Sequence, residues 1–315
     1  MAGQPGTPGA KRTQIAASGA RAATASVFGS STRRGDRVAN AAFLALLLAA
    51  LTIALVALAA IIVWAVIEGA PRLNVGLLTQ GPSTLSPETA GYRTAILGTL
   101  LVIGGVILLI VPLGVGAAVY LEEYANRERW YNRFIEVNIQ NLAGVPSIVY
   151  GILGLAFIVR GPVSLGFVAA AGSLTLALLV LPTVIIAARE AIRAVPPSIR
   201  QGALALGATE WQTIGRQVLP AALPGILTGV ILAISRAIGE AAPLLLVGAV
   251  TFVTFNPQFF DGGYSTLPVM IYNYAGRPQE EFRALAAAGV IVMLALLLAM
   301  NAFAIWLRNR YEQKW

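Results

Sequence analysis

The sequence predicts an all-α polytopic membrane protein with six transmembrane helices. Of its 315 residues, 57% are hydrophobic and only 11% are charged, whereas soluble domains carry about 25% charged residues. Several stretches without any ionisable residue are longer than the roughly 20 apolar residues that cross a bilayer. Because so few charges are available to cover a globule, lipid is the expected solvent for most of the chain.

Each predicted helix corresponds to one of these apolar stretches. Five of the six contain no ionisable residue, and the fifth along the chain contains only Arg236 and Glu240. The predicted helices cover about residues 40–67, 94–120, 138–159, 164–188, 221–247 and 284–307. Together they form one transmembrane domain, residues 38–315.

Residues 1–37 precede this domain and are predicted to form a disordered basic tail. They are rich in Gly, Ala, Ser, Thr and Pro and lack apolar periodicity. The first apolar run starts near residue 38 and is too long for the core of a signal peptide, so no cleavable signal is expected. The tail sets the topology or contacts anionic lipid headgroups through its arginines.

The positive charges predict the orientation of the chain. The tail, the loops after the second and fourth helices, and the C-terminal segment together contain sixteen Lys and Arg residues. The opposite side contains five, namely Arg72, Arg93, Arg160, Arg277 and Arg283. Cytoplasmic loops carry the excess of Lys and Arg, so both termini are predicted to be cytoplasmic. The net charge of +8 therefore reflects membrane orientation rather than nucleic-acid binding.

The composition excludes several kinds of chemistry. The chain contains no Cys and no His, which excludes disulfides, thiolate metal sites and catalytic triads based on imidazole. Lys occurs only at Lys11 and Lys314, and neither lies in a phosphate-binding G-x-x-x-x-G-K-[ST] loop. If the protein uses ATP, the ATPase is a separate polypeptide.

The predicted cytoplasmic loop 189–220 has the pattern of a helical elbow. Pro196 and Pro197 end one helix, and Ser198 is a candidate N-cap for a short helix that follows. Gly207 permits a left-handed turn, and Thr209 is a candidate cap for a second short helix that ends before Pro220. The elbow is half apolar, so it either lies on its own membrane or inserts into a groove on a cytoplasmic partner.

Arg236 and Glu240 are four residues apart and share one helix face. Counted from Ala221, Arg236 lies ~23 Å along the helix, where an ionised side chain costs about 2.5–3.5 kcal/mol. The pair must therefore face protein or water. It is either a structural ion pair or an anion path, in which Glu240 orients the planar donor fork of Arg236.

An aromatic segment follows the fifth predicted helix. Its seven aromatic residues either anchor the chain at the headgroup level or belong to a re-entrant gate or a dock for an external partner. They are Phe252, Phe255, Phe259, Phe260, Tyr264, Tyr272 and Tyr274.

The elbow resembles the EAA loop of ABC importer permeases, whose pattern is E-A-A-x-x-x-G-x(9)-I-x-L-P. Gln201–Gly207 matches its first part, and Leu219 and Pro220 match its end. Further runs resemble PstA-type permease subunits of bacterial phosphate importers, and the likeness spans roughly residues 40–310. These runs are Val119–Ala125, Leu142–Gly151, Arg236–Leu245, Leu267–Asn273 and Arg277–Ala286.

This resemblance implies a MetI-like type I importer fold in a bacterial inner membrane and a transport role without bond-breaking chemistry. The implied partners are a PstC-like permease, two copies of a cytoplasmic ABC ATPase and an extracytoplasmic phosphate-binding protein. ATP and Mg²⁺ would bind to the ATPase, and no cofactor or metal to this chain. The implied coupling residues are Gln201, Gly202, Ala203, Leu206, Gly207, Leu219 and Pro220. Arg236 would meet or guide phosphate along the substrate path, and Glu240 would orient Arg236.

The sequence departs from the family pattern at three positions. Gln201 replaces the leading Glu, Gly202 replaces the Ala that follows it, and Gln217 replaces the Ile. Because Gln forms no ion pair, the strength of the contact with the ATPase is open. Other functions also remain open: transport of sulfate, molybdate or another oxyanion, or an ATP-independent channel or secondary transporter. A membrane enzyme or scaffold is disfavoured, since the predicted spans contain neither Asp nor Lys.

Overall fold

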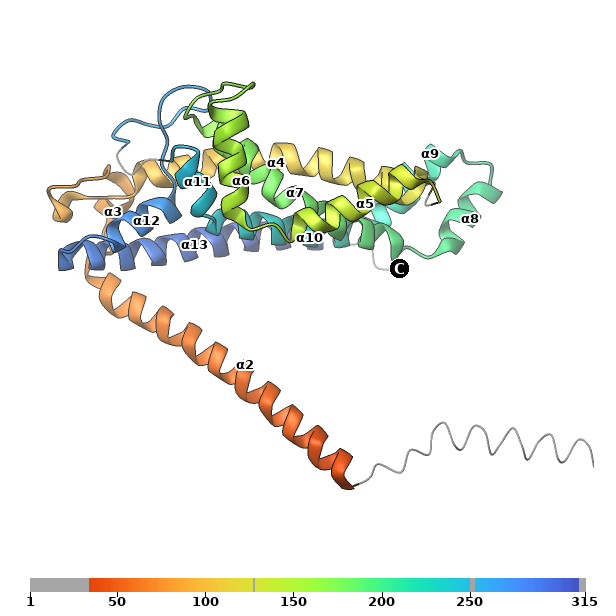
Figure 1. Ribbon diagram of the computed structural model, residues 1–315, viewed down its shortest axis with the longest axis horizontal. Helices are drawn as coiled ribbons and strands as arrows, with labels where there is room; N and C mark the ends of the chain where they lie inside the picture. The colour runs from red at the N-terminus through yellow and green to blue at the C-terminus, as the bar shows by residue number, and fades with distance from the viewer. Residues whose placement is uncertain (1–33, 127, 250–252, 312–315) are drawn as a thin grey trace, which may run out of the picture. The chain divides into compact units, whose positions relative to one another are not determined.

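The computed structural model describes residues 34–126, 128–249 and 253–311. These residues are mostly helical (Figure 1), and the only β pairing within them is an isolated bridge between Ala249 and Tyr264. The chain divides into two compact units, residues 1–62 and 63–315. Among the described residues, five helices are long and apolar enough to cross a membrane, and a bent helix pair makes a sixth when it is counted as one span. The predicted all-α, six-span class is confirmed.

The first predicted span is confirmed as α2 (Arg34–Gly69), which begins just inside the range of the predicted tail. The rest of that tail, residues 1–33, lies outside the described residues. Three short elements follow α2, namely η1 (Ala70–Arg72), α3 (Val75–Thr79) and η2 (Pro87–Thr89). They connect it to the second predicted span.

The second span is also confirmed, as α4 (Arg93–Val119). It continues without a break into a π-helical turn, η3 (Tyr120–Tyr124). Pro112 lies inside α4 without ending it.

The third predicted helix, 138–159, is wrong as a single straight span. The structure has α5 (Trp130–Ala143) and then α6 (Ser147–Leu153), which continues as the π-helical segment η4 (Gly154–Val159). The two parts meet at an angle of 108°. The bend lies at Gly144-Val145-Pro146, because proline lacks an N–H and disfavours helical backbone at the residue before it.

The fourth helix, α7 (Ala169–Arg193), starts later than predicted and extends further. The expected start at 164 was wrong because Ser164 and Gly166 have φ angles of 48° and 75°, which a right-handed helix does not accept. Sixteen of the 25 residues of α7 are buried, so α7 is the central helix of its unit. Figure 1 shows α4, α7, α10 and α13 lengthwise beside one another, with α6 crossing them.

The elbow forms as a helix–Gly–helix, with two local corrections. Helix α8 (Pro197–Ala205) has Pro196, not Ser198, at its N-cap, because Pro197 fits the first helical turn. Gly207 has φ 84°, as expected, and Thr209 caps α9 (Glu210–Thr213) in a capping box with Gln212. The second elbow helix does not stop before Pro220, however. It runs through the π-helical η5 (Ile214–Val218) into α10 (Leu219–Gly239), where Pro220 lies in the first turn.

The fifth predicted helix, 221–247, is broken. Helix α10 ends at Gly239, and a separate short helix, α11 (Ala242–Leu246), follows. Pro243 lies in the first turn of α11, where its missing N–H is tolerated, and it would break the hydrogen bonding of a continuous helix. The last span is confirmed and is longer than predicted, as α13 (Glu280–Tyr311).

Small residues bring the central helices close together. A Cβ at Gly114 of α4 would lie 2.6 Å from Val184 Cγ1 of α7, and a Cβ at Gly229 of α10 would collide with Ala187. The larger buried cluster is built mainly on α4, α7 and α10, and a smaller one lies on α3, α12 (Leu267–Ala275) and α13. Van der Waals packing over such small faces is how helices associate where water is absent.

The aromatic segment is divided between core and surface. Tyr264 and Tyr274 are completely buried, whereas Phe255, Phe260 and Tyr272 are exposed. The backbone of the segment is inserted into the bundle, because Ala170 N–H donates to the Phe259 carbonyl at 2.9 Å. Phe252 lies outside the described residues.

Candidate functional site

The break between α10 and α11 holds the two predicted pathway residues. Arg236 lies in the last turn of α10, and Glu240 is its C-cap in extended backbone. The Glu240 N–H donates to the Ala237 carbonyl at 3.3 Å, which closes the last turn. A cation in a final helical turn is favoured by the carbonyls that remain without helical partners there.

The two side chains pair loosely. Arg236 Nε lies 3.6 Å from Glu240 Oε1, and the side chains are 42% and 20% exposed. Within the described part of the chain, this is the only ion pair or hydrogen bond of the Arg236 side chain. Its terminal nitrogens are therefore available to another acceptor, such as an oxyanion.

A second helix break lies next to this one. The Leu142 carbonyl, near the end of α5, accepts a hydrogen bond from the Tyr150 hydroxyl at 2.9 Å. Gly151 of α6 packs so closely on α11 that a Cβ would lie 2.7 Å from Pro243 Cα. Irregular backbone at membrane depth is tolerated where it is buried in protein or lines a water-filled path. The site is therefore built where two broken helices meet.

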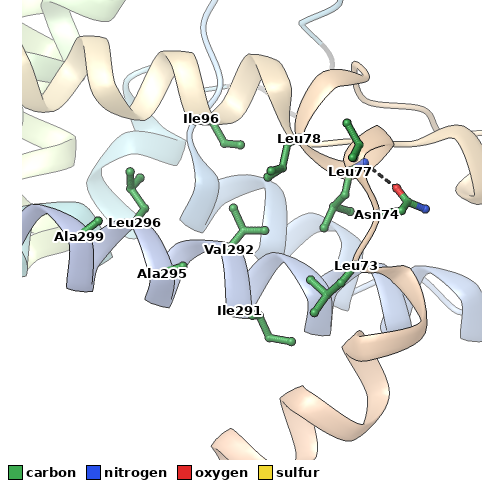
Figure 2. Close-up of a pocket in the computed structure, with 11 residues that line it drawn as sticks. Leu73, Asn74, Leu77, Leu78, Ile96, Ile291, Val292, Ala295, Leu296 and Ala299 are labelled. Carbon is green, nitrogen blue, oxygen red and sulfur yellow. Dashed lines mark hydrogen bonds between the residues drawn. The ribbon is translucent and has the colours of Figure 1, made fainter.

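A large apolar cavity lies elsewhere and has different chemistry (Figure 2). It measures about 810 Å³ and is lined by residues of α3, α4 and α13 and by the two residues before α3. Its only polar lining residue is Asn74, whose side chain accepts the Leu77 N–H at 2.9 Å as an N-cap. Because no charged group lines it, this cavity suits apolar groups and not an anion.

The structure separates the predicted coupling residues into two places. Gln201, Gly202, Leu206 and Gly207 are exposed on the elbow, where the Leu206 side chain is 91% exposed, and Ala203 is half-buried. Leu219 and Pro220 instead line an apolar groove of about 480 Å³ between α4 and the start of α10. The exposed apolar tip and the helical base of the elbow are thus distinct surfaces.

The sequence analysis missed an ion-pair network that joins the elbow to the helices next to it. It joins Glu122 and Glu123 of η3 to arginines of α7 and α8, and it includes Glu136, Arg189, Arg193 and Arg200. The sequence signal for this network was Glu122 and Glu123, two adjacent acidic residues on the side of the membrane that is predicted to be basic. Among the described residues, no group of His, Cys, Asp and Glu is arranged to hold a metal ion.

Comparison with known proteins agrees with this architecture. Residues 110–313 match the family model of the binding-protein-dependent transport system inner membrane component. The chain is 35% identical to the phosphate transport system permease protein PstA of Haemophilus influenzae, over 76% of this chain and 82% of that protein.

Two solved structures share the fold. A chain of a bacterial alginate ABC transporter aligns with TM-score 0.62 and 14% identity, covering 89% of this chain and 98% of that one. A chain of the inward-facing MetNI methionine ABC transporter aligns with TM-score 0.55 and 16% identity, covering 69% and 92%. The MetI-like permease fold predicted from the resemblance is confirmed.

The fold and the site define a polytopic membrane permease of the ABC importer class, which is a transport component and not an enzyme. More narrowly, the chain belongs to the family of inner membrane components of binding-protein-dependent transport systems.

Proposed function

We propose that this chain is a permease subunit of an ATP-driven importer that carries inorganic phosphate into the cytoplasm. The observation that carries the proposal is the 35% identity, over three quarters of the chain, to a protein named as a phosphate transport permease. The loosely paired Arg236 gives this chemistry a place in the molecule.

Arg236 meets or guides phosphate, and Glu240 orients the guanidinium of Arg236. The pair lies on one helix and so joins α10 to no other element, which favours a pathway role over a structural ion lock. Anion passage also requires attraction weak enough for release. One arginine that is partly neutralised by a nearby carboxylate meets this requirement better than a deep basic pocket.

The partners follow from the exposed surfaces of the chain. The Arg236–Glu240 pair is partly exposed in this chain alone, and a charged pair at membrane depth needs protein or water beside it. A PstC-like second permease provides this neighbour. The exposed apolar elbow suits a groove on one of two copies of a cytoplasmic ATPase, which hold ATP and Mg²⁺. An extracytoplasmic phosphate-binding protein delivers the anion from the other side.

The mechanism is rigid-body gating. The ATPases approach each other on binding ATP, and the elbow converts this movement into rotation of the permease halves. The outer mouth then opens, and the binding protein releases phosphate towards Arg236. Hydrolysis restores the inward-facing state. In this arrangement both termini and the elbow are cytoplasmic.

The test is reconstitution of the chain with its partner permease and ATPase in liposomes that enclose ATP, with the binding protein and phosphate added outside. We expect uptake of radiolabelled phosphate that requires ATP and that excess sulfate or molybdate does not inhibit. Competition by sulfate or molybdate would assign the importer to another oxyanion. Uptake without ATP, and without co-purification of an ATPase, would assign the chain to channels or secondary transporters.

A further inference from the structure

The π-helical turn η3 carries two adjacent carboxylates that bind different helices. Glu122 pairs with α7, whereas Glu123 pairs with α8 of the elbow. Because η3 is the direct continuation of α4, these two residues connect three elements at one point.

On the Glu122 side of this connection, the Glu122–Arg189 pair is deeply buried, whereas Arg193 is 44% exposed. Glu122 and Arg189 are 6% and 7% exposed, and Arg189 Nε lies 3.6 Å from Glu122 Oε2. Arg193 donates to both Glu122 oxygens, at 3.0 and 3.1 Å, and Arg189 also donates to Glu136 of α5 at 2.8 Å. Separating ion pairs with so little water available leaves uncompensated charge, so α4, α5 and α7 are held together here.

The Glu123 side attaches the elbow. Arg200 of α8 donates to Glu123 through Nε and Nη2, the shortest contact being 2.7 Å. The same guanidinium donates to the carbonyls of Ile192 and Val195, at 2.9 and 2.7 Å, and so caps the end of α7. One arginine therefore fixes α8 to both α4 and α7, with two-point geometry that a Lys does not reproduce.

We propose that Glu123 and Arg200, supported by Glu122 with Arg189 and Arg193, form a rigid joint that passes movement of the elbow into α4 and α7. This inference rests on the proposed transport function. The neighbouring elbow residue Gln201 is uncharged and exposed, so it forms no ion pair. The ion pair that attaches the elbow is made by the adjacent Arg200. Helix α7 packs on α10, which carries Arg236, so the joint connects the ATPase side to the candidate substrate path. These are positioning residues that do not meet phosphate.

The first test compares Glu123→Gln with Glu128→Gln in the reconstituted importer. Glu128 is an exposed carboxylate in the segment that follows η3. We expect Glu123→Gln to bind the ATPase and hydrolyse ATP, while the phosphate imported per ATP falls about tenfold, equivalent to about 1.4 kcal/mol of coupling. Glu128→Gln should keep the wild-type ratio. A wild-type ratio in Glu123→Gln would overturn the proposal.

The second test does not depend on the transported substrate. Spin labels are placed at Leu113→Cys on α4 and Ser198→Cys on α8, both exposed positions in a chain without native Cys. A rigid joint keeps their distance unchanged when ATP binds to the assembled importer, and adding Glu123→Gln broadens the distribution. A distance that changes with ATP in the otherwise wild-type chain would overturn the joint, even if Glu123→Gln does not assemble. Absence of phosphate uptake with an unchanged distance would instead refute the phosphate assignment alone.

Discussion

Arg236 and Arg189 carry the same charge in opposite surroundings. Arg189 is 7% exposed and pairs with two carboxylates on other helices, whereas Arg236 is 42% exposed and has one loose partner on its own helix. Removing one partner of a buried ion pair is strongly destabilising, so Arg189 is suited to structure. Arg236 keeps unused donors and is suited to a transient ligand.

At this scale we predict the effect of Arg236→Gln. Hydrogen bonds to charged groups contribute about 1.5–3 kcal/mol, so phosphate uptake should fall about tenfold to hundredfold. Arg236→Lys should retain part of the uptake, because it keeps the charge and loses the fork. Initial rates of uptake in proteoliposomes measure the effect, and Arg283→Gln, at an exposed outer position, is the matched control. Unchanged uptake at normal expression would refute the pathway role, and failure of Arg236→Gln to fold would support a structural one.

At the scale of elements, proline accounts for both interruptions of the predicted spans. Pro146 precedes α6, and Pro243 lies in the first turn of α11. Pro112 and Pro182 lie inside continuous helices, so proline alone does not identify a break. The segments after these two prolines also pack against each other through Gly151, and α11 directly follows the end of α10, which carries Arg236.

The contact between the broken helices gives a prediction for Gly151→Ala. The added Cβ would lie 2.7 Å from backbone Cα of Pro243, and such overpacking costs typically about 1–3 kcal/mol. We expect a lower thermal midpoint in lipid nanodiscs and reduced uptake. Gly104→Ala is the matched control, because its Cβ would meet no heavy atom within 4 Å. Equal midpoints for the two variants would show that α6 and α11 do not pack this closely.

At the scale of the whole molecule, four of the five arginines on the proposed outer side have contacts within the described residues. Three of them donate to atoms of outer loops: Arg72 to the Pro87 carbonyl, Arg277 to the Thr84 carbonyl and Arg93 to Asn256 Oδ1. Arg160 lies over the ring of Phe167, 5.6 Å from its centroid. These residues hold loops in place, and the sixteen positive charges of the other side remain a clear majority.

The orientation itself is tested by single-cysteine labelling, since the native chain contains no Cys. Leu206→Cys on the elbow should react with a membrane-impermeant maleimide only in inverted vesicles. Phe260→Cys in the outer aromatic segment, where the side chain is 74% exposed, should react in intact cells. The opposite pattern would invert the proposed topology and place the elbow beyond the reach of a cytoplasmic ATPase.

The sequence by itself determined the features that depend on local chemistry. Apolar length set the number of spans, Gly207 set the left-handed turn, and Thr209 set the cap of α9, because each acts on its own neighbours in the chain. Arg236 and Glu240, four residues apart, do meet at 3.6 Å, but Glu240 is the C-cap in extended backbone and does not lie on the helix face that the spacing predicted. The bent third span and the late start of α7 were missed because each depends on only a few residues. Pro146, Ser164 and Gly166 interrupt the helix locally, whereas hydropathy is averaged over a whole span.

Only the tertiary structure decided which charges meet across the fold. Glu122 and Arg193 are 71 residues apart in the chain, and Glu123 and Arg200 are 77 apart. No periodicity connects such distant positions, because their approach depends on the close packing of α4 on α7 and on the geometry of the elbow. The juxtaposition of two broken helices at Arg236 has the same origin. It results from packing around buried glycines, which hydropathy does not encode.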